Sequence, residues 1–220
     1  MKKIVHCNIG VVATMAAVML LATAAIAQDL QPINLPKPDT TGGKPLMQAL
    51  KLRRSSRAFS PEKLSRQSLS NLLWAAFGVN RPDGHRTAPS AMNWQEIDLY
   101  VAMEEGLYVY DADSNILKPV LKQDLRAKTG TQSFVKDAFM NLVYVADLSK
   151  TKRASGEDQT LFIGADCGFI AQNVYLYCAS EGLAVVVRGS VDKDALSKAM
   201  GLRSDQKIIL AQSVGYPLNH

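Results

Sequence analysis

The sequence predicts a single domain of mixed helices and strands, built around one hydrophobic core. Segments with helical apolar periodicity alternate with short runs typical of strands, and two of those runs are close enough to form a hairpin. No internal repeat is visible. The length of 220 residues suits one substantial core but not comfortably two.

Residues 1–27 have the features of a secretory signal peptide. Two lysines give a positive start, residues 11–26 form an almost uncharged apolar run, and Ala25 and Ala27 provide a small-x-small pattern before a cleavage point after Ala27. An uncleaved membrane anchor is the alternative, although the run is short for a span. We therefore expect a periplasmic or secreted protein of 193 residues, with no membrane span in the mature chain.

The composition argues against several classes of function. Removal of residues 1–27 takes away two lysines and no acids, so the net charge falls from +5 to +3, which is too mild to indicate a nucleic-acid partner.

The two cysteines of the mature chain are predicted to be too far apart to form a disulfide. On one helix, Cys167 and Cys178 would lie about 16 Å apart along the axis, beyond the Cα separation of about 7 Å that a disulfide allows. We expect two free, buried thiols. No metal site is indicated, because the mature chain has only two histidines and no clustered cysteines.

The first part of the mature chain predicts an arm and two helices. Residues 28–43, with three prolines and two adjacent glycines, predict an arm that lies over the surface or over a partner. Residues 44–52 carry a rough apolar stripe and predict a helix that leads directly into an arginine-rich turn. Ser65 is a good N-cap for a second helix, whose apolar stripe ends at Gly78.

The rest of the chain predicts strands with helices between them. The nearly continuous apolar run of residues 142–148 is typical of a strand covered on both faces. Residues 122–138 have a helical and then an irregular pattern, and residues 150–159 predict a polar, mobile excursion. The remaining strands are predicted at 96–103 and 107–110, joined as a hairpin, and at 184–187 and 207–214, with helices at 161–180 and 192–200.

The arginine-rich turn is the first candidate for chemistry. Arg53, Arg54 and Arg57 place three guanidinium groups within five residues, and Ser55 and Ser56 add hydroxyl donors beside them. Because guanidinium groups match phosphate oxygens two at a time, we expect an anionic ligand there. A solvated basic surface is the alternative interpretation.

The long loop of residues 78–93 is the second candidate. Sixteen residues without a period is long for a connection in a compact domain, and such loops are usually functional. Small residues at Ser90 and Ala91 would let a flat ligand approach the backbone. Asn93 and Gln95 can each donate and accept hydrogen bonds, which suits the edge of a heterocycle. An ordinary surface loop is the alternative.

Five motifs then occur in the order found in one known family. They are Arg-Arg-Ser-x-Arg-x-Phe after the first helix, Pro-Ser-Ala-x-Asn-x-Gln before the first strand, a helix rich in glycine and alanine that ends in Glu-Gly-Leu, a strand ending in Arg-Gly, and a last strand ending in Val-Gly-Tyr-Pro. Across nearly all of residues 44–217 the chain resembles the FMN-dependent nitroreductase superfamily, particularly its SagB-type dehydrogenases.

The resemblance implies an α+β fold with a central, mostly antiparallel sheet flanked by helices, in a homodimer that holds two FMN molecules at the subunit interface. Residues 1–27 would be the signal peptide, 28–43 an N-terminal arm, and 44–220 the FMN-binding domain. The cofactor-binding residues carried over by position are Arg53, Arg54, Ser55, Arg57, Pro89, Ser90, Ala91, Asn93, Val187, Arg188 and Gly189.

Three segments would share this binding. In the first, Arg53 and Ser55 would face the phosphate and ribityl end, and Arg57 would stabilise the negative charge that the flavin ring gains on reduction. The second, residues 89–93, would come from the opposite subunit. The third, residues 187–189, is a strand end whose backbone N–H would approach flavin N5, which leaves the side chain of Arg188 free to vary.

The sequence departs from the family pattern in two places. Many relatives carry a Lys-x-Arg pair after the last strand to bind the phosphate, whereas this chain ends in Leu-Asn-His. Arg188 stands where relatives often have an acid. Either the arginine-rich turn holds the phosphate alone, or phosphate binding is weak.

The implied function is an exported FMN-dependent oxidoreductase of the nitroreductase type. A donor, usually NAD(P)H in relatives, would reduce the flavin, and a small flat organic substrate would then bind on the same face, which gives ping-pong kinetics. No protein acid or base is assigned a catalytic role, because the chemistry belongs to the flavin. The alternatives are an exported flavin-binding or structural protein without turnover, and an anion-binding module that uses the arginine-rich turn.

Overall fold

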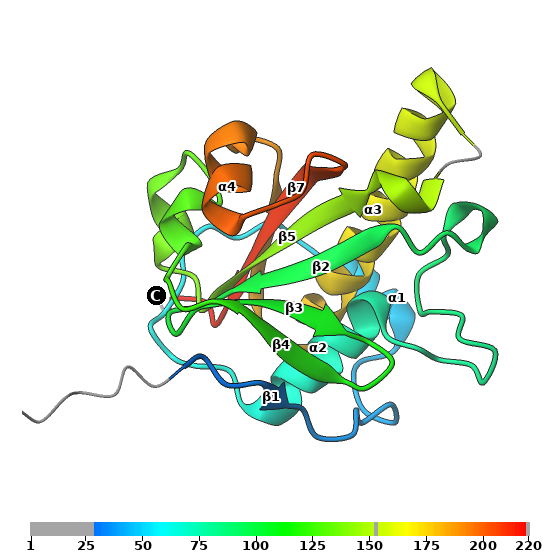
Figure 1. The fold of residues 1–220 in the computed structure, drawn as a ribbon. Coiled ribbons are helices and arrows are strands. Elements are labelled where there is room, and N and C mark those ends of the chain that lie inside the picture. The colour runs from blue at the N-terminus through cyan, green and yellow to red at the C-terminus, as the bar shows by residue number, and fades with distance from the viewer. Residues whose placement is uncertain (1–28, 152–153, 219–220) are drawn as a thin grey trace, which may run out of the picture.

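A computed structural model describes residues 29–151 and 154–218 (Figure 1). The predicted signal peptide lies outside the described residues. Within them, seven strands form one sheet in the order β1-β4-β3-β2-β5-β7-β6, and every neighbouring pair is antiparallel. The strands are β1 (Ile33–Asn34), β2 (Ile97–Ala102), β3 (Leu107–Asp111), β4 (Ile116–Leu121), β5 (Met140–Asp147), β6 (Ala184–Arg188) and β7 (Gln206–Gly215). The helices are α1 (Leu46–Leu52), α2 (Arg66–Phe77), α3 (Gly156–Glu181) and α4 (Lys193–Met200).

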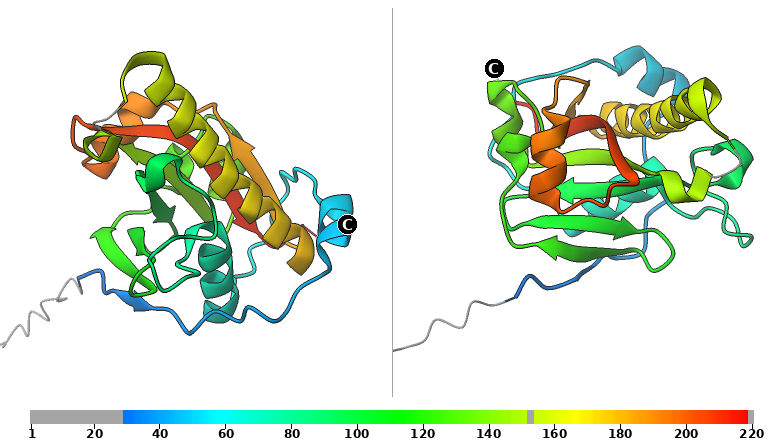
Figure 2. Two further views of the ribbon diagram at one scale, coloured as in Figure 1. Left: turned by 90° about the vertical axis from the view of Figure 1, so that its right-hand side faces the viewer. Right: turned by 45° about the horizontal axis from the view of Figure 1, so that its top comes forward.

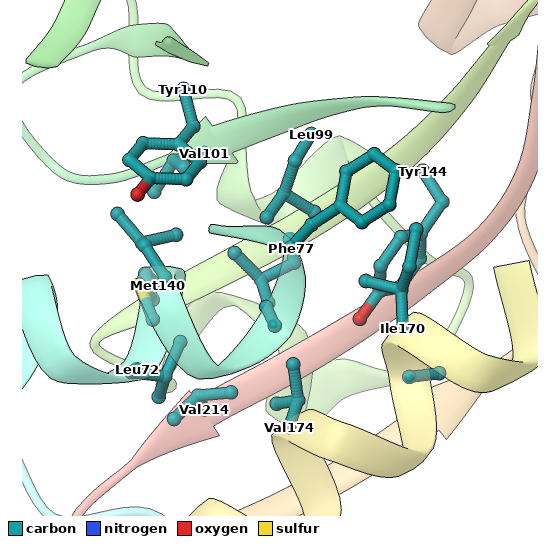
Figure 3. Close-up of a cluster of buried hydrophobic side chains, with 14 of the residues drawn as sticks. Leu72, Phe77, Leu99, Val101, Tyr110, Met140, Tyr144, Ile170, Val174 and Val214 are labelled. Carbon is teal, nitrogen blue, oxygen red and sulfur yellow. The ribbon is translucent and has the colours of Figure 1, made fainter. Parts of the chain in front are cut away.

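Helices cover both faces of this sheet, so the predicted α+β class is confirmed (Figure 2). On one face, Leu72 of α2 and Ile170 and Val174 of α3 pack into the main core (Figure 3). On the other face, Leu196 of α4 packs in a second buried cluster. Because β5 lies between these two layers, all eight of its residues are buried, as its apolar run predicted.

The local signals for helix ends are confirmed. The Ser65 hydroxyl accepts a hydrogen bond from Ser68 N at 3.0 Å and caps α2, which ends at Gly78. In the same way, the Asp192 side chain accepts from Ala195 N at 3.0 Å and caps α4. The Ser65 cap works through neighbouring residues alone, which is why the sequence was sufficient to place it.

Helix α1 forms as predicted, but its apolar stripe is not part of the core. Of its seven residues only Ala49 is buried, through packing of α1 on α3. Met47 is 76% exposed, and Leu46, Leu50 and Leu52 are exposed as well. The apolar residues Leu161, Phe162 and Phe169 on α3 are also exposed. The fold therefore leaves large apolar side chains in solvent on both helices.

The residues that follow the predicted signal peptide pack on this chain's own surface. Ile33 pairs with Leu117 and adds a short strand beside β4. The Pro36 carbonyl accepts hydrogen bonds from Ser70 Oγ at 2.5 Å and from Asn115 Nδ2 at 2.9 Å. Residues 29–43 thus protect one edge of the sheet.

The prediction of a helix within residues 122–138 is wrong. This stretch contains only two short 3₁₀ turns, Arg126–Lys128 and Ser133–Lys136. Between them, the Thr129 carbonyl accepts a hydrogen bond from the Arg188 side chain, and a Cβ at Gly130 would lie 2.0 Å from that guanidinium. The segment is shaped by a side chain from β6, which its own sequence does not reveal.

Two further boundaries differ from the prediction. Strand β4 was not assigned, because Pro119 interrupts its pattern; the proline is tolerated on a strand whose outer neighbour, β1, has only two residues. Helix α3 begins at Gly156, inside the segment predicted to be a mobile excursion. Glu157 and Asp158 in its first turn favour that start, because acids stabilise the positive end of the helix dipole.

In the part of the chain that the structure describes, no helix is long and apolar enough to span a bilayer.

Cys167 and Cys178 are both free and buried, as predicted. Both lie on α3, on the side that packs in the main core. Burial raises the pKa of the Cys167 thiol to about 12 and raises the pKa of Cys178 as well. Neither thiol is therefore poised to act as a nucleophile.

Candidate functional site

The arginine-rich turn lies directly against strand β6. Ser56 N donates to the Val185 carbonyl at 2.8 Å, and the Ser55 and Tyr175 hydroxyl oxygens are 2.8 Å apart. The same Tyr175 hydroxyl accepts a hydrogen bond from Val187 N at 2.9 Å. Two of the three segments predicted to bind the cofactor are thus brought together, and a tyrosine from α3 joins them.

The turn carries positive charge that the rest of the described chain does not neutralise. None of its three arginines forms an ion pair within residues 29–151 and 154–218. Arg53 lies 5.3 Å from the centre of the Tyr175 ring, which is a cation–π contact. Arg53 and Arg54 line a groove of about 450 Å³ together with Lys44 and Lys51. This set of donors fits a phosphate group.

Three residues of this site carried no recognisable signal in the sequence. Tyr175 lies in the middle of a helix whose residues the pattern assigned to packing. Lys44 and Lys51 precede the arginine-rich turn, and only the fold shows that they share its groove. They supply basic groups in a chain that lacks a basic pair after its last strand.

Arg188 differs from its predicted role, because its side chain is structural. It is 5% exposed, and its guanidinium donates to the Thr129 carbonyl at 2.7 Å and to Asn141 Oδ1 at 2.8 Å. Burial lowers the pKa of Arg188 to about 10. The prediction that this side chain is free to vary is therefore wrong, since it fixes the neighbouring loop. Its neighbour Gly189 is exposed, just beyond the end of β6.

The third predicted segment contacts α3 closer to the start of the helix than Tyr175 lies. Ala91 N donates to Asp166 Oδ2 at 2.8 Å. Asp166 and Tyr175 are nine residues apart on one helix, which corresponds to about 13 Å along its axis. Residues 89–93 are therefore not brought to the arginine-rich turn of the same chain. Within one chain the three segments therefore form two separate groups along α3.

The loop that contains this segment has an unusual backbone. Met92, Asn93 and Gln95 have φ angles of 51°, 53° and 49°. Left-handed backbone costs a residue with a side chain about 1–2 kcal/mol, so contacts elsewhere must hold the loop. Arg86 Nε donates to Gln95 Oε1 at 2.7 Å, and Gln95 Nε2 donates to Asn93 Oδ1 at 2.9 Å. The two amides predicted to face a heterocycle thus bond to each other in this chain.

Two buried carboxyl groups lie beneath the same loop. Glu96 is fully buried, and Asp166 is 3% exposed. Ser90 Oγ donates to Glu96 Oε2 at 3.1 Å and accepts from Gln95 N at 2.9 Å. Burial raises the pKa of Glu96 to about 7, and the negative charge of Asp166 acts in the same direction. Neither acid was singled out from the sequence, because one precedes a strand and the other lies in a largely apolar helix.

The fold and this site define a class of protein. A sequence profile of the Nitroreductase family matches residues 50–216, and the chain belongs to this family. The narrower resemblance to SagB-type dehydrogenases stays a prediction.

Particular relatives agree with this assignment. A crystal structure from Ralstonia eutropha JMP134, provisionally assigned as a nitroreductase, is 43% identical with a TM-score of 0.84, and the match covers 89% of this chain and 94% of that one. A protein of Methanocaldococcus jannaschii with the same provisional assignment is 30% identical over 148 residues, which are 63% of this chain and 75% of that protein. The NADPH:FMN oxidoreductase from Vibrio harveyi, complexed with NAD+, is 19% identical with a TM-score of 0.61 over 79% of this chain and 69% of that one, which shows the fold alone.

The role of Tyr175 can be tested by Tyr175→Phe, which keeps the ring beneath Arg53 and removes the hydroxyl. The Val187 N–H then loses its partner, so we expect the free energy of unfolding to fall by about 1–2 kcal/mol in urea titrations. Tyr177→Phe on the same helix is the matched control, because that hydroxyl donates to the Ser68 carbonyl at 3.3 Å and interacts with Asn71, and neither partner belongs to the arginine-rich turn or to β6. Equal losses in the two variants would contradict a linking role for Tyr175.

Proposed function

We propose that this protein is an exported, homodimeric, FMN-dependent oxidoreductase that exchanges electrons with a small, flat organic substrate. One observation carries the proposal: a cationic turn without acidic partners in the described chain lies against the end of β6 and is joined to it through Tyr175. Membership of the nitroreductase family supports an oxidoreductase that uses a flavin.

The residues of the turn have the chemistry needed to hold FMN. Arg53 and Arg54, helped by Lys51, would neutralise the phosphate, and Arg57 would lie near the ring edge that becomes negative on reduction. When bound, FMN supplies the hydride and electron transfer. Among the described residues, a Cβ at Gly189 would meet no atom closer than Leu210 at 3.9 Å. The chain's own packing therefore does not require glycine there, whereas close approach of a flat ring would.

The homodimer is supported by the exposed apolar side chains of α1 and α3. A large exposed apolar patch on a globular protein usually marks an interaction surface. The two helices pack on each other and present side chains such as Met47 and Leu161, which is 65% exposed. In the proposed homodimer a second copy covers these side chains, and residues 89–93 of one subunit complete the site at the turn of the other.

We expect the protein to bind FMN and to lose affinity when the turn is altered. Protein purified with excess FMN should show the absorbance of bound flavin, which NADH or NADPH reduces and an acceptor such as a quinone restores. Arg53→Ala should weaken FMN binding by about tenfold to a hundredfold, because a charge-assisted hydrogen bond contributes about 1.5–3 kcal/mol.

Two comparisons sharpen this test. Riboflavin, which lacks the phosphate, should bind wild type and Arg53→Ala almost equally. Lys207→Ala, at the far end of β7, removes the same charge outside the site and should leave FMN affinity unchanged. A colourless protein would refute the proposed function, and bound flavin that no donor or acceptor can cycle would favour a flavin-binding protein without turnover.

We expect Met47→Glu to break the dimer, because it places a charge in an apolar interface. Size-exclusion chromatography with light scattering should give twice the chain mass for wild type and a single chain mass for the variant. Val120→Glu is the matched control, since Val120 is an exposed apolar residue on β4, away from α1 and α3. A wild-type monomer that binds FMN would contradict the shared site.

Export can be measured directly on the expressed full-length chain. The positively charged start and apolar run of residues 1–27 should direct the protein across the inner membrane of a bacterial host. Protein recovered from the periplasmic fraction should then begin at Gln28 by N-terminal sequencing. Recovery of the intact chain from the cytoplasmic fraction would contradict export.

A further inference from the structure

The loop of residues 90–95 is anchored by the buried Glu96–Asp166 pair. Ala91 N donates to Asp166 Oδ2 at 2.8 Å, which ties the first half of the loop to α3. Glu96 Oε2 accepts from Ser90 Oγ, and that same oxygen of Ser90 accepts from the backbone N–H of Gln95, which ties the second half. The two carboxyl groups thus hold both halves of a loop whose backbone is strained.

Two neighbouring buried carboxylates are difficult to ionise together. Each charge loses its hydration on burial and repels the other. Glu96 Oε1 is buried, and among the described residues it has no hydrogen-bond partner. A proton on Glu96 would remove one charge, and the resulting O–H could donate to the adjacent Asp166 carboxylate.

In the described part of the chain, no cation compensates the pair instead. The titratable and charged groups around it are Cys167 on α3, Arg86 in the long loop, Asp98 on β2, and Asp147 and Lys150 at the end of β5. The two basic groups bond to Gln95, Arg86 to its side chain and Lys150 to its carbonyl at 3.2 Å. Within the described residues, neither Glu96 nor Asp166 forms an ion pair.

We propose that Glu96, with its proton directed at the adjacent Asp166 carboxylate, acts together with Asp166 as a latch that holds loop 90–95 in the shape required at the cofactor site of a second copy. Both are positioning residues, since they would act through the loop rather than on the substrate. The loop's role toward FMN rests on the proposed function, whereas the latch is a property of the chain itself.

The latch has a defined dependence on pH. When the loop is closed, Glu96 keeps its proton to a higher pH than an exposed carboxyl does, because burial raises its pKa. When the loop opens, Glu96 titrates at its ordinary, lower pKa. Opening is therefore disfavoured in acid, becomes easier as the pH rises through the pKa of the closed state, and is easiest above it.

Amide hydrogen exchange of the purified protein measures this opening. The protection of Ala91 N–H and Gln95 N–H, corrected for the intrinsic rate, should fall by on the order of tenfold or more between pH 5.5 and 8.5 in wild type. Glu96→Gln should keep protection at every pH, because its amide can donate to Asp166 and cannot titrate. Glu96→Ala should lose protection at every pH, and Glu62→Gln, an exposed control, should behave as wild type.

Infrared spectroscopy provides a second readout that does not depend on opening of the loop. Near pH 6 the wild-type protein should show the carbonyl band of a buried protonated carboxylic acid, and Glu96→Gln should lack it. A flat protection profile in wild type, a pH step that persists in Glu96→Gln, or the absence of that band would each overturn the latch.

FMN titrations separate this inference from the proposed function. The ratio of the FMN dissociation constant of wild type to that of Glu96→Gln should rise from pH 5.5 to 8.5, because the closed fraction of the loop falls only in wild type, and the titration of the FMN phosphate cancels in this ratio. A protein whose amide protection falls with pH but that binds no FMN would contradict the proposed function and support the latch. FMN binding with a constant ratio of dissociation constants, and amide protection that does not change with pH, would contradict the latch and support the proposed function.

Discussion

Helix α3 packs across one face of the sheet, and both halves of the candidate site depend on that packing. Its apolar side holds Ile170 and Val174 in the main core, which fixes the rotation of the helix about its axis. With the rotation fixed, Tyr175 meets the arginine-rich turn and β6, while Asp166 meets the long loop. The same contacts that stabilise the core therefore set the distance between two groups of functional residues.

The arginine side chains of this protein lie in two different environments. Arg188 is buried and satisfied by neutral oxygens, so it shapes the neighbouring loop without attracting a ligand. The arginines of residues 53–57 remain near solvent and have no acidic partner within the described chain. Only the second arrangement leaves a favourable place for a phosphate, because a group that is already bonded internally has little to gain from an anion.

The proposed shared site between two copies would give a role to features that have none in a single subunit. The apolar stripe of α1 is exposed, and residues 89–93 lie far along α3 from the turn. Either feature by itself would also be compatible with a monomer. Together with the family assignment they support the proposed arrangement, in which burial of apolar surface would drive association and complete the flavin pocket.

The sequence by itself determined the features that short-range chemistry controls. The cap of α2, the buried strand β5 and the first two candidate segments follow from local sequence patterns, and motif order indicated the family and with it the third segment. Only the tertiary structure decided that the α1 stripe is exposed, that Arg188 is buried, and that Tyr175, Glu96 and Asp166 belong to the site. Periodicity reveals which side of an element is apolar, but not what covers it. Contacts between residues far apart in the chain arise only when the elements pack.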